Sequence, residues 1–250
     1  YFNDLLGGGA EAVNLSLRSP YDDGNLFLGA VTDISTRFED REKSLARTVS
    51  YIAAAVSAKR GNYMVYFPSY DYMHKAAELF AKRFPAVKLL EQTRGMTRID
   101  RDSFLTQFRL GDGAMRVGFC VLGGSFSEGV DLPGQCLIGA VIVGVGIPGL
   151  SGERNIMRDY FQLTRECGYD YAYTYPGMNN VLQAAGRVIR SDTDCGIVVL
   201  IDDRYATEQY RSMYPEHWRN MQYFCQPASL NAAISEFWRG KSPKNADKQD

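Results

Sequence analysis

Short apolar runs that stop abruptly at polar or turn-forming residues recur along this chain, and they restrict its fold class. Each run is almost continuously apolar rather than alternating, which is typical of strands buried on both faces of a parallel sheet. Five strands are predicted in this way, at residues 26–31, 64–67, 116–122, 137–145 and 197–201, with a weaker sixth at 87–90. Longer amphipathic stretches separate them. The sequence therefore predicts a three-layer α/β fold, in which helices cover both faces of a mostly parallel sheet.

Helices are predicted where apolar residues recur at a period near 3.6 and where Gly or Pro ends the pattern. They span 40–59, 70–84, 100–110 and, after a turn at Pro176 and Gly177, 179–189. The segment 147–175 is longer than a usual helix–strand connection, so we interpret it as an insertion with its own helix at 156–167. The polar tail 241–250 is predicted to be disordered, which leaves one domain over 1–240.

Composition narrows the possible partners and compartments. The 250 residues carry 28 Lys and Arg against 29 Asp and Glu, so any basic binding surface must be local. Five scattered Cys without a C-x-x-C pair, and only two His, predict no metal site and a reducing, cytoplasmic compartment. The longest apolar run is too short for a membrane span. Because the chain starts at Tyr1 rather than Met, we expect it to be a piece of a longer protein.

Ligands of open α/β sheets bind outside the carboxyl ends of the strands. In this sequence that rule selects Ser69 and Tyr70, the loop after Leu122, and the residues 202–204.

The sharpest local pattern is Q-A-A-G-R-V-I-R, from Gln183 to Arg190. Offsets of three, four and seven place Gln183, Gly186, Arg187 and Arg190 on one stripe of the predicted helix 179–189. Two arginines there either reach a polyanion or form ion pairs on a surface helix. The glycine between the polar residues permits close approach of phosphate or another backbone, which favours the polyanion.

A second pattern is the Gly- and Ser-rich loop that follows the strand predicted at 116–122. Its glycines let backbone N–H groups face an oxyanion, and Ser125 and Ser127 add hydroxyl donors. Glu128 and Asp131 could orient an arginine, a ribose hydroxyl or a water. Taken alone, such a loop is also consistent with a simple turn. It matches neither the G-x-G-x-x-G nor the G-x-x-x-x-G-K-[ST] pattern, so neither dinucleotide nor P-loop binding is indicated.

Together the two patterns resemble motifs V and VI of superfamily 2 helicases, specifically of the Rad3/XPD and DinG-like branch. The resemblance rests on the patterns S-x-x-E-G-x-D-L-x-G at 125–134 and Q-x-x-G-R-x-x-R at 183–190. Residues 64–70 resemble motif IV, 89–95 the strand and loop that follow it, and 200–204 a strand ending in an acid–basic pair. Ser19-Pro20-Tyr21 resembles the Ser-Pro-Phe tripeptide that begins the family's second motor domain. The likeness covers residues 1–218.

The resemblance implies the second of two RecA-like domains of the P-loop NTPase type, with the first motor domain absent from this chain. In the family, ATP binds with Mg²⁺ in the cleft between the two domains, and single-stranded DNA crosses both. The Mg²⁺ ligands and, where present, an iron–sulfur cluster belong mainly to the first domain. The expected partners are therefore single-stranded DNA and the first RecA-like domain of the same polypeptide, without a membrane.

The resemblance also assigns roles to residues at the nucleotide. Arg187 and Arg190 would reach the β- and γ-phosphates across the cleft, where charge spreads over the transferred phosphoryl group. Gln183 would position the γ-phosphate or the attacking water. The remaining residues implied for the ATP site are Gly129, Asp131, Glu128 and Gly186, of which Gly129 and Asp131 would couple nucleotide state to the grip on DNA.

A second set would bind nucleic acid. Ser125 and Ser127 lie where motif V touches the backbone of the strand. Ser69, Tyr70, Arg94, Arg98 and Arg101 would line the strand track, which suits binding independent of base sequence. For Tyr70 packing at a helix start, and for the arginines a solvated face, are the alternatives.

The expected function is the C-terminal motor domain of an ATP-dependent DNA helicase in repair or recombination, inactive as an isolated fragment. Two alternatives stay open: a non-catalytic RecA-like module that binds nucleic acid or protein, and a helicase-like subunit of a nuclease complex. A small-molecule enzyme that uses the Gly/Ser loop is least favoured, because both His lie far from that loop in the sequence.

Overall fold

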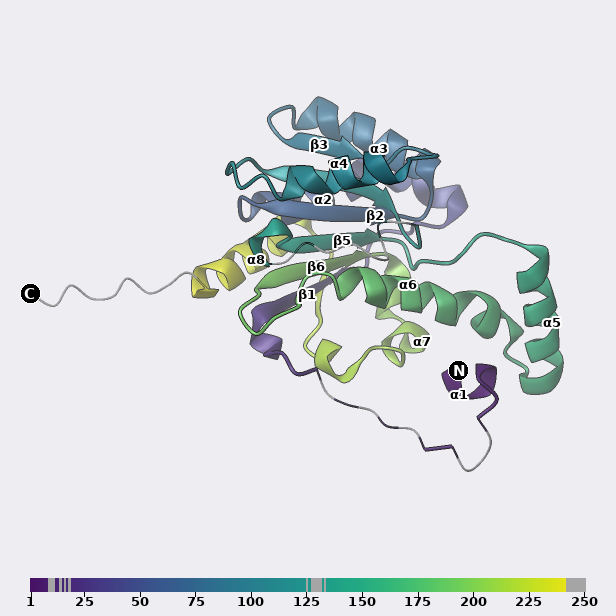
Figure 1. Cartoon of the computed structure of the whole chain (residues 1–250). Helices are drawn as coiled ribbons and strands as arrows, with labels where there is room; N and C mark the ends of the chain where they lie inside the picture. The colour runs from purple at the N-terminus through teal and green to yellow at the C-terminus, as the bar shows by residue number, and fades with distance from the viewer. Residues whose placement is uncertain are drawn as a thin grey trace, which may run out of the picture.

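The computed structural model describes residues 1–8, 12–13, 15, 17, 19–124, 126, 132 and 134–241. Seven strands form one sheet in the order β3-β4-β2-β5-β6-β1-β7, and every neighbouring pair is parallel (Figure 1). The strands are β1 (Leu26–Val31), β2 (Asn62–Phe67), β3 (Lys88–Glu91), β4 (Arg116–Val121), β5 (Gly139–Val143), β6 (Gly196–Ile201) and β7 (Gln222–Phe224). The predicted α/β class is confirmed, and each of the six predicted strands lies within two residues of its predicted position.

Helices cover both faces of this sheet. One face packs against α2 (Arg41–Ser57), α3 (Tyr70–Arg83) and α8 (Pro227–Lys241). The other packs against α4 (Arg98–Phe108), α6 (Tyr175–Ala185) and the region of the short α7 (Glu208–Arg211). The six residues of β2 are all buried and alternate between the two cores, with Tyr63, Val65 and Phe67 on one side and Met64 and Tyr66 on the other. Burial on both sides explains why the strands appear in the sequence as continuous apolar runs.

The sequence missed two elements near the C-terminus. Strand β7 has three residues and pairs only with β1, so it carries too little pattern to be seen. Helix α8 does carry a signal, because Leu230, Ile234 and Trp238 are buried at four-residue intervals. It ends at Lys241, and the tail predicted to be disordered continues outside the described residues.

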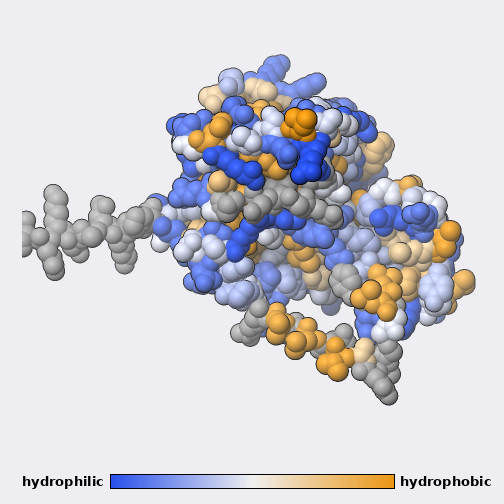
Figure 2. All heavy atoms as spheres, viewed as in Figure 1, coloured by the Kyte–Doolittle hydropathy of each residue, from blue (hydrophilic) through white to orange (hydrophobic). Residues whose placement is uncertain are grey.

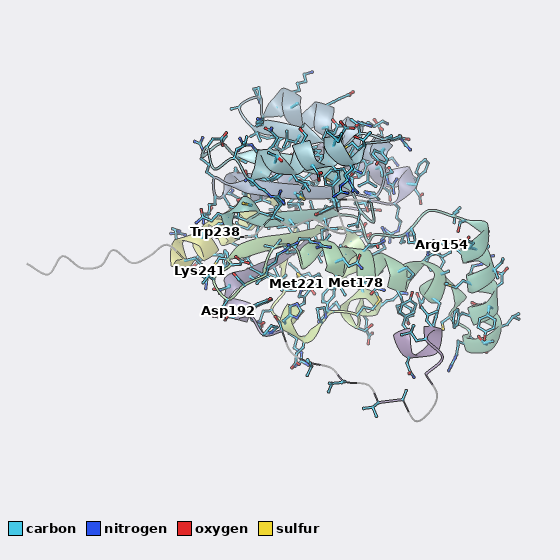
Figure 3. All side chains as sticks on the ribbon, in the orientation of Figure 1. Arg154, Met178, Asp192, Met221, Trp238 and Lys241 are labelled. Carbon is cyan, nitrogen blue, oxygen red and sulfur yellow. The ribbon has the colours of Figure 1, made fainter. Side chains whose placement is uncertain are left out.

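The segment after β5 forms a helical hairpin that stands away from the sheet beyond the carboxyl end of β5 (Figure 1). Its first arm is α5 (Gly152–Arg165), the helix predicted at 156–167; its second is a π-helical turn, Asp170–Thr174, that continues into α6. Arg154 points from α5 toward the second arm, where its Nη1 donates to the Ala172 carbonyl at 3.0 Å (Figure 3). Exposed apolar side chains gather on this hairpin and the nearby N-terminal segment (Figure 2), among them Leu6, Ile156 and Leu163.

Aromatic rings hold the hairpin together and anchor the start of the chain. Phe161 of α5 stacks on Tyr171 of the π-helical turn, with ring centroids 4.0 Å apart. Tyr1 packs on Tyr171 and Tyr175 at 5.4 and 5.0 Å. This contact places the short helix α1 (Phe2–Leu5) beside the hairpin (Figure 1).

Helix α6 approaches the chain after β5 so closely that only glycine fits at Gly177. A Cβ on this residue would lie 2.7 Å from the Val145 carbonyl oxygen. We therefore expect Gly177→Ala to lower the free energy of unfolding by about 1–3 kcal/mol, because backbone atoms would have to move apart. Gly152→Ala in α5, where nothing lies within 4 Å of the added Cβ, should be neutral or slightly stabilising. Urea denaturation of both variants measures the difference, and equal stabilities would contradict the close approach.

Candidate functional site

Because the strands are parallel, their carboxyl ends share one edge of the sheet, where ligands of open α/β sheets bind. Residues from four strand ends come to this edge: Ser69 and Tyr70 after β2, Gln92 after β3, Leu122 after β4 and Asp202 after β6. It is the edge that the sequence selected. The described residues form two groups there, one at β6 and β1 and the other at β3, β4 and β2.

The first group is built around Asp202, which is fully buried at the end of β6. Its carboxylate accepts hydrogen bonds from the Thr36 hydroxyl, from Thr36 N at 3.2 Å, and from Arg204 Nε and Nη2 at 2.6 and 2.9 Å. Burial alone would raise the pKa of Asp202, but the hydrogen bonds and charge of Arg204 outweigh it, so the pKa lies below its ordinary value. Asp202 therefore holds Arg204 in place as a charged pair.

Arg41, which sequence reasoning missed, connects this group to the second. Its Nε donates to the Thr36 carbonyl at 3.0 Å, and its Nη1 lies 3.5 Å from Ser69 Oγ. The guanidinium also lies over the rings of Phe38 and Tyr72, 5.7 and 5.6 Å from their centroids. A lone arginine in the first turn of a predicted helix carries no pattern that separates it from a solvated side chain, so only the fold reveals its position.

The second group contains Tyr70, Gln92 and Arg94. Gln92 is 3% exposed; its Nε2 donates to the Tyr70 hydroxyl at 2.9 Å, and its Oε1 accepts from Val121 N at 2.8 Å. The Arg94 guanidinium lies over the Tyr70 ring, 4.6 Å from its centroid. The structure thus brings together Tyr70 and Arg94, both predicted to contact nucleic acid, and adds Gln92 between them.

Ser69 and Arg98 have local structural roles as well. Ser69 is the N-cap of α3 and accepts from Tyr72 N at 3.4 Å. Arg98 begins α4, is 88% exposed, and lies 4.0 Å from Asp102. Unlike Arg94, Arg98 makes no contact with Tyr70 within the described part of the chain. Arg101 lies one turn further along α4 and is half-buried.

The Q-x-x-G-R-x-x-R stripe does not lie on one helix, so that prediction is wrong. Helix α6 spans Tyr175–Ala185, with the predicted turn at Pro176 and Gly177 inside it, and it ends at Gly186. Arg187 and Arg190 lie in the connection to β6. The reason is local: the buried carboxylate of Asp194 accepts from Arg190 N and Ser191 N, both at 2.8 Å, and so turns the chain out of the helix.

The backbone of Arg190 is anchored on both sides. Besides the bond from its N–H to Asp194, its carbonyl accepts from the Tyr21 hydroxyl at 2.8 Å. Tyr21 and Gly186 also line a mainly apolar cavity of about 340 Å³ with Leu182 and Trp218. Ser19-Pro20-Tyr21 and the motif resembling motif VI are therefore neighbours, although about 165 residues separate them.

The two arginines follow α6, which packs on the same face of the sheet as α4. Burial raises the pKa of the Tyr66 hydroxyl, and the positive charges of Arg187 and Arg190 act in the opposite direction. The same hydroxyl donates to the Phe126 carbonyl at 3.3 Å. Arg187 and Arg190 are half-buried, and Gln183, on the last full turn of α6, is exposed.

The loop that resembles motif V is only partly described. Phe126 and Leu132 are buried in the core beneath α4 and α6, and Phe126 packs on Phe104 with centroids 4.6 Å apart. Five residues predicted to bind ATP or nucleic acid lie outside the described residues: Ser125, Ser127, Glu128, Gly129 and Asp131.

Residues 52–221 match the family described as the helicase C-terminal domain. The chain belongs to this family. The match begins inside α2 and ends shortly after α7, so it includes the Gly/Ser loop and the two arginines described above. The resemblance to the Rad3/XPD helicases is confirmed.

Relatives of this helicase C-terminal domain carry helicase names. The chain is 25% identical over 260 residues to the ATP-dependent DNA helicase chl1 of Aspergillus fumigatus, covering 88% of this chain and 32% of that protein. It is 26% identical over 211 residues to the general transcription and DNA repair factor IIH helicase subunit XPD of Dictyostelium discoideum, covering 79% of this chain and 26% of that protein. The chain thus spans about a third or less of the length of these relatives.

Solved structures agree on the fold. The structure named XPD_Helicase matches with a TM-score of 0.62 and 19% identity, over 80% of this chain and 36% of that one. The domain-2 structure of the DEAD-box helicase Mss116p bound to an RNA duplex matches with a TM-score of 0.51 and 13% identity, over 85% of this chain and 69% of that one. The RecA-like architecture is therefore confirmed.

The donor groups of this helicase C-terminal domain fit the phosphates of a nucleotide. Guanidinium groups present N–H donors that match phosphate oxygens, and Arg187 and Arg190 each carry one. Within the ranges that the structure describes, no group of three or more His, Cys, Asp or Glu side chains could hold a metal ion.

No helix among the described residues combines the length and the apolar character that a membrane crossing needs.

Proposed function

We propose that this chain is the second motor domain of an ATP-dependent DNA helicase. In this proposal Arg187 and Arg190 complete an ATP site whose Mg²⁺ is held mainly by a first motor domain of the natural protein. The carboxyl edge with Ser69, Tyr70 and Arg94 holds single-stranded DNA. The relatives named chl1 and XPD point to DNA repair or recombination as the process that it serves.

The observation that carries the proposal is the juxtaposition of two arginines and the Gly/Ser loop on a RecA-like sheet. Arg187 and Arg190 follow α6, and the loop begins against this helix, since a Cβ on Gly123 would lie 3.1 Å from Asn180 Nδ2. Guanidinium groups stabilise the negative charge on a transferred phosphoryl group. Catalysis of phosphoryl transfer depends mainly on such electrostatic stabilisation and on positioning. Movement of the loop with nucleotide would reach the strand ends at the carboxyl edge, because the loop begins directly after β4.

ATP hydrolysis by the natural full-length protein, with and without single-stranded DNA, tests the proposal. We expect DNA to stimulate turnover, since nucleotide and DNA sites share one sheet. The 250-residue chain alone should hydrolyse no ATP, because it supplies only one side of the site. Absence of turnover in the full-length protein would favour a non-catalytic RecA-like module, and turnover by the chain alone would contradict the two-domain site.

A further inference from the structure

Gln92 is a deeply buried polar side chain at the carboxyl edge. The proposed ATP site and the proposed DNA contacts do not include it. It follows β3 and is 3% exposed. Burying an amide costs free energy unless its polar atoms are hydrogen-bonded. Here Gln92 Oε1 accepts from Val121 N, and Gln92 Nε2 donates to the Tyr70 hydroxyl. A Cβ on Gly124 would lie 3.6 Å from Gln92 Nε2, so the chain after β4 passes close to the same amide.

The chemistry of these partners fixes the direction of both hydrogen bonds. The Val121 N–H can only donate, so it must face Gln92 Oε1, which turns Nε2 toward Tyr70. An amide nitrogen cannot accept, so the Tyr70 oxygen accepts from Nε2. The hydroxyl hydrogen of Tyr70 is therefore left to donate elsewhere. Within the described ranges, no protein group accepts it.

A positive charge lies beside this hydroxyl. The Arg94 guanidinium covers the Tyr70 ring at 4.6 Å, and its Nη2 lies 3.3 Å from Asp71 Oδ1. The side chains of Arg94 and Asp71 are 69% and 86% exposed, so water screens their attraction and the ion pair is weak. Arg94 can therefore exchange Asp71 for another anion without losing much stability.

We propose that Gln92 is a positioning residue that directs the Tyr70 hydroxyl, beside Arg94, onto one backbone phosphate of single-stranded DNA. The inference rests on the proposed function and specifies which part of the strand Tyr70 contacts. A hydroxyl donor next to a guanidinium suits an anionic oxygen and carries no base preference. Gln92 Nε2 donates to the phenol oxygen from the inner side, so the hydroxyl hydrogen points away from Gln92 and is available as a donor.

Four variants of the natural full-length protein test this inference, one of them Tyr70→Ala, which removes the ring together with the hydroxyl. Tyr70→Phe removes the hydroxyl and keeps the ring. Gln92→Glu keeps the shape and the acceptor for Val121 N, but offers Tyr70 a carboxylate, so the hydroxyl would donate inward instead of to phosphate. Tyr223→Phe is the matched control, because Tyr223 is an exposed tyrosine of β7, at the end of the strand order opposite β3.

Binding is measured by fluorescence anisotropy on an oligo-dT strand and on an abasic strand of equal length. Tyr70→Phe and Gln92→Glu should each weaken binding about tenfold, which is the loss of one hydrogen bond to a charged group. The loss should be the same on both strands, since both retain the phosphates. In DNA-stimulated ATP hydrolysis the half-saturating DNA concentration should rise about tenfold, with kcat at saturating DNA within about twofold. A merely structural defect would lower kcat as well.

Two outcomes would overturn the inference while leaving the proposed function intact. In the first, Tyr70→Phe binds like the natural protein and Tyr70→Ala loses affinity on oligo-dT alone, which would mean that the ring stacks on bases. In the second, Gln92→Glu binds like the natural protein, which would remove the positioning role. Tyr70→Phe keeps the test decisive if Gln92→Glu fails to fold. If the unaltered protein binds neither strand, the proposed function itself is contradicted, and the inference with it.

Discussion

Arg190→Ala in the natural full-length protein is expected to lower DNA-stimulated ATP hydrolysis by roughly 10³-fold to 10⁵-fold, the range that arginine fingers contribute to phosphoryl transfer. The fold should survive, because Arg190 is anchored through its backbone, by Asp194 on the N–H and by Tyr21 on the carbonyl. Alanine keeps both of these bonds. The substitution therefore removes the guanidinium and keeps the backbone contacts. The measurement is kcat at saturating ATP and DNA, beside the thermal midpoint of each protein.

Arg239→Ala is the matched control for this experiment. Arg239 is an exposed arginine of α8, which packs on the face of the sheet opposite α6. Its loss should leave turnover unchanged. Arg190→Lys should recover only part of the activity, because an ammonium cannot form the paired hydrogen bonds of a guanidinium. Equal turnover in Arg190→Ala and Arg239→Ala would show that Arg190 does not reach the phosphates, and would favour a retained scaffold without catalysis.

The sheet could be predicted from the sequence because burial on both faces leaves a local mark. Every residue of β2 is buried, so the strand appears as an uninterrupted apolar run whichever face each side chain points to. The parallel arrangement then placed Ser69, Tyr70 and the residues 202–204 at one edge without further information. These predictions needed only the chain order and the rule that parallel strands end together.

The end of α6 could not be predicted in the same way. The pattern of apolar residues continues past Gly186, and Val188 is indeed buried, but as part of a turn rather than a helix. What ends the helix is the Asp194 carboxylate bonding back to Arg190 N and Ser191 N, and a periodicity analysis does not detect such a bond. The arginines could be identified from the sequence, whereas their position depends on the local hydrogen bonds of the Asp194 side chain, which leave no periodic pattern.

Gln92 and Arg41 were missed for a different reason. Each acts through residues distant in the sequence: Gln92 through Tyr70 and Val121, and Arg41 through Thr36 and Ser69. A single glutamine or arginine has no spacing signature of its own. Such residues become visible only when the strands that carry their partners are placed side by side.

Asp202→Asn is expected to lower the free energy of unfolding of the chain by about 3–5 kcal/mol, the cost of breaking a buried ion pair from one side. Asp202 is fully buried and the Arg204 side chain is 18% exposed, so the substitution would leave a guanidinium that water barely reaches. Asp203→Asn is the neighbouring control. Asp203 pairs with Arg37 at 2.7 Å, but both side chains are about 40% exposed. Losing this ion pair should therefore lower the free energy of unfolding by about 1 kcal/mol or less.

The Asp202–Arg204 pair also predicts how the stability lost in Asp202→Asn depends on pH. The pKa of Asp202 is lower in the folded chain than its ordinary value of about 4, so folding favours the ionised form. Its contribution is fully present above the unfolded pKa and is lost as pH falls below about 4 through the folded pKa. Urea denaturation of the unaltered chain and Asp202→Asn should therefore show a gap that is constant near neutral pH and narrows in acid. If at pH 7 Asp202→Asn lowers the free energy of unfolding no more than Asp203→Asn does, the desolvation of Arg204 is offset elsewhere. Asp202 would then not be the residue that fixes the end of β6.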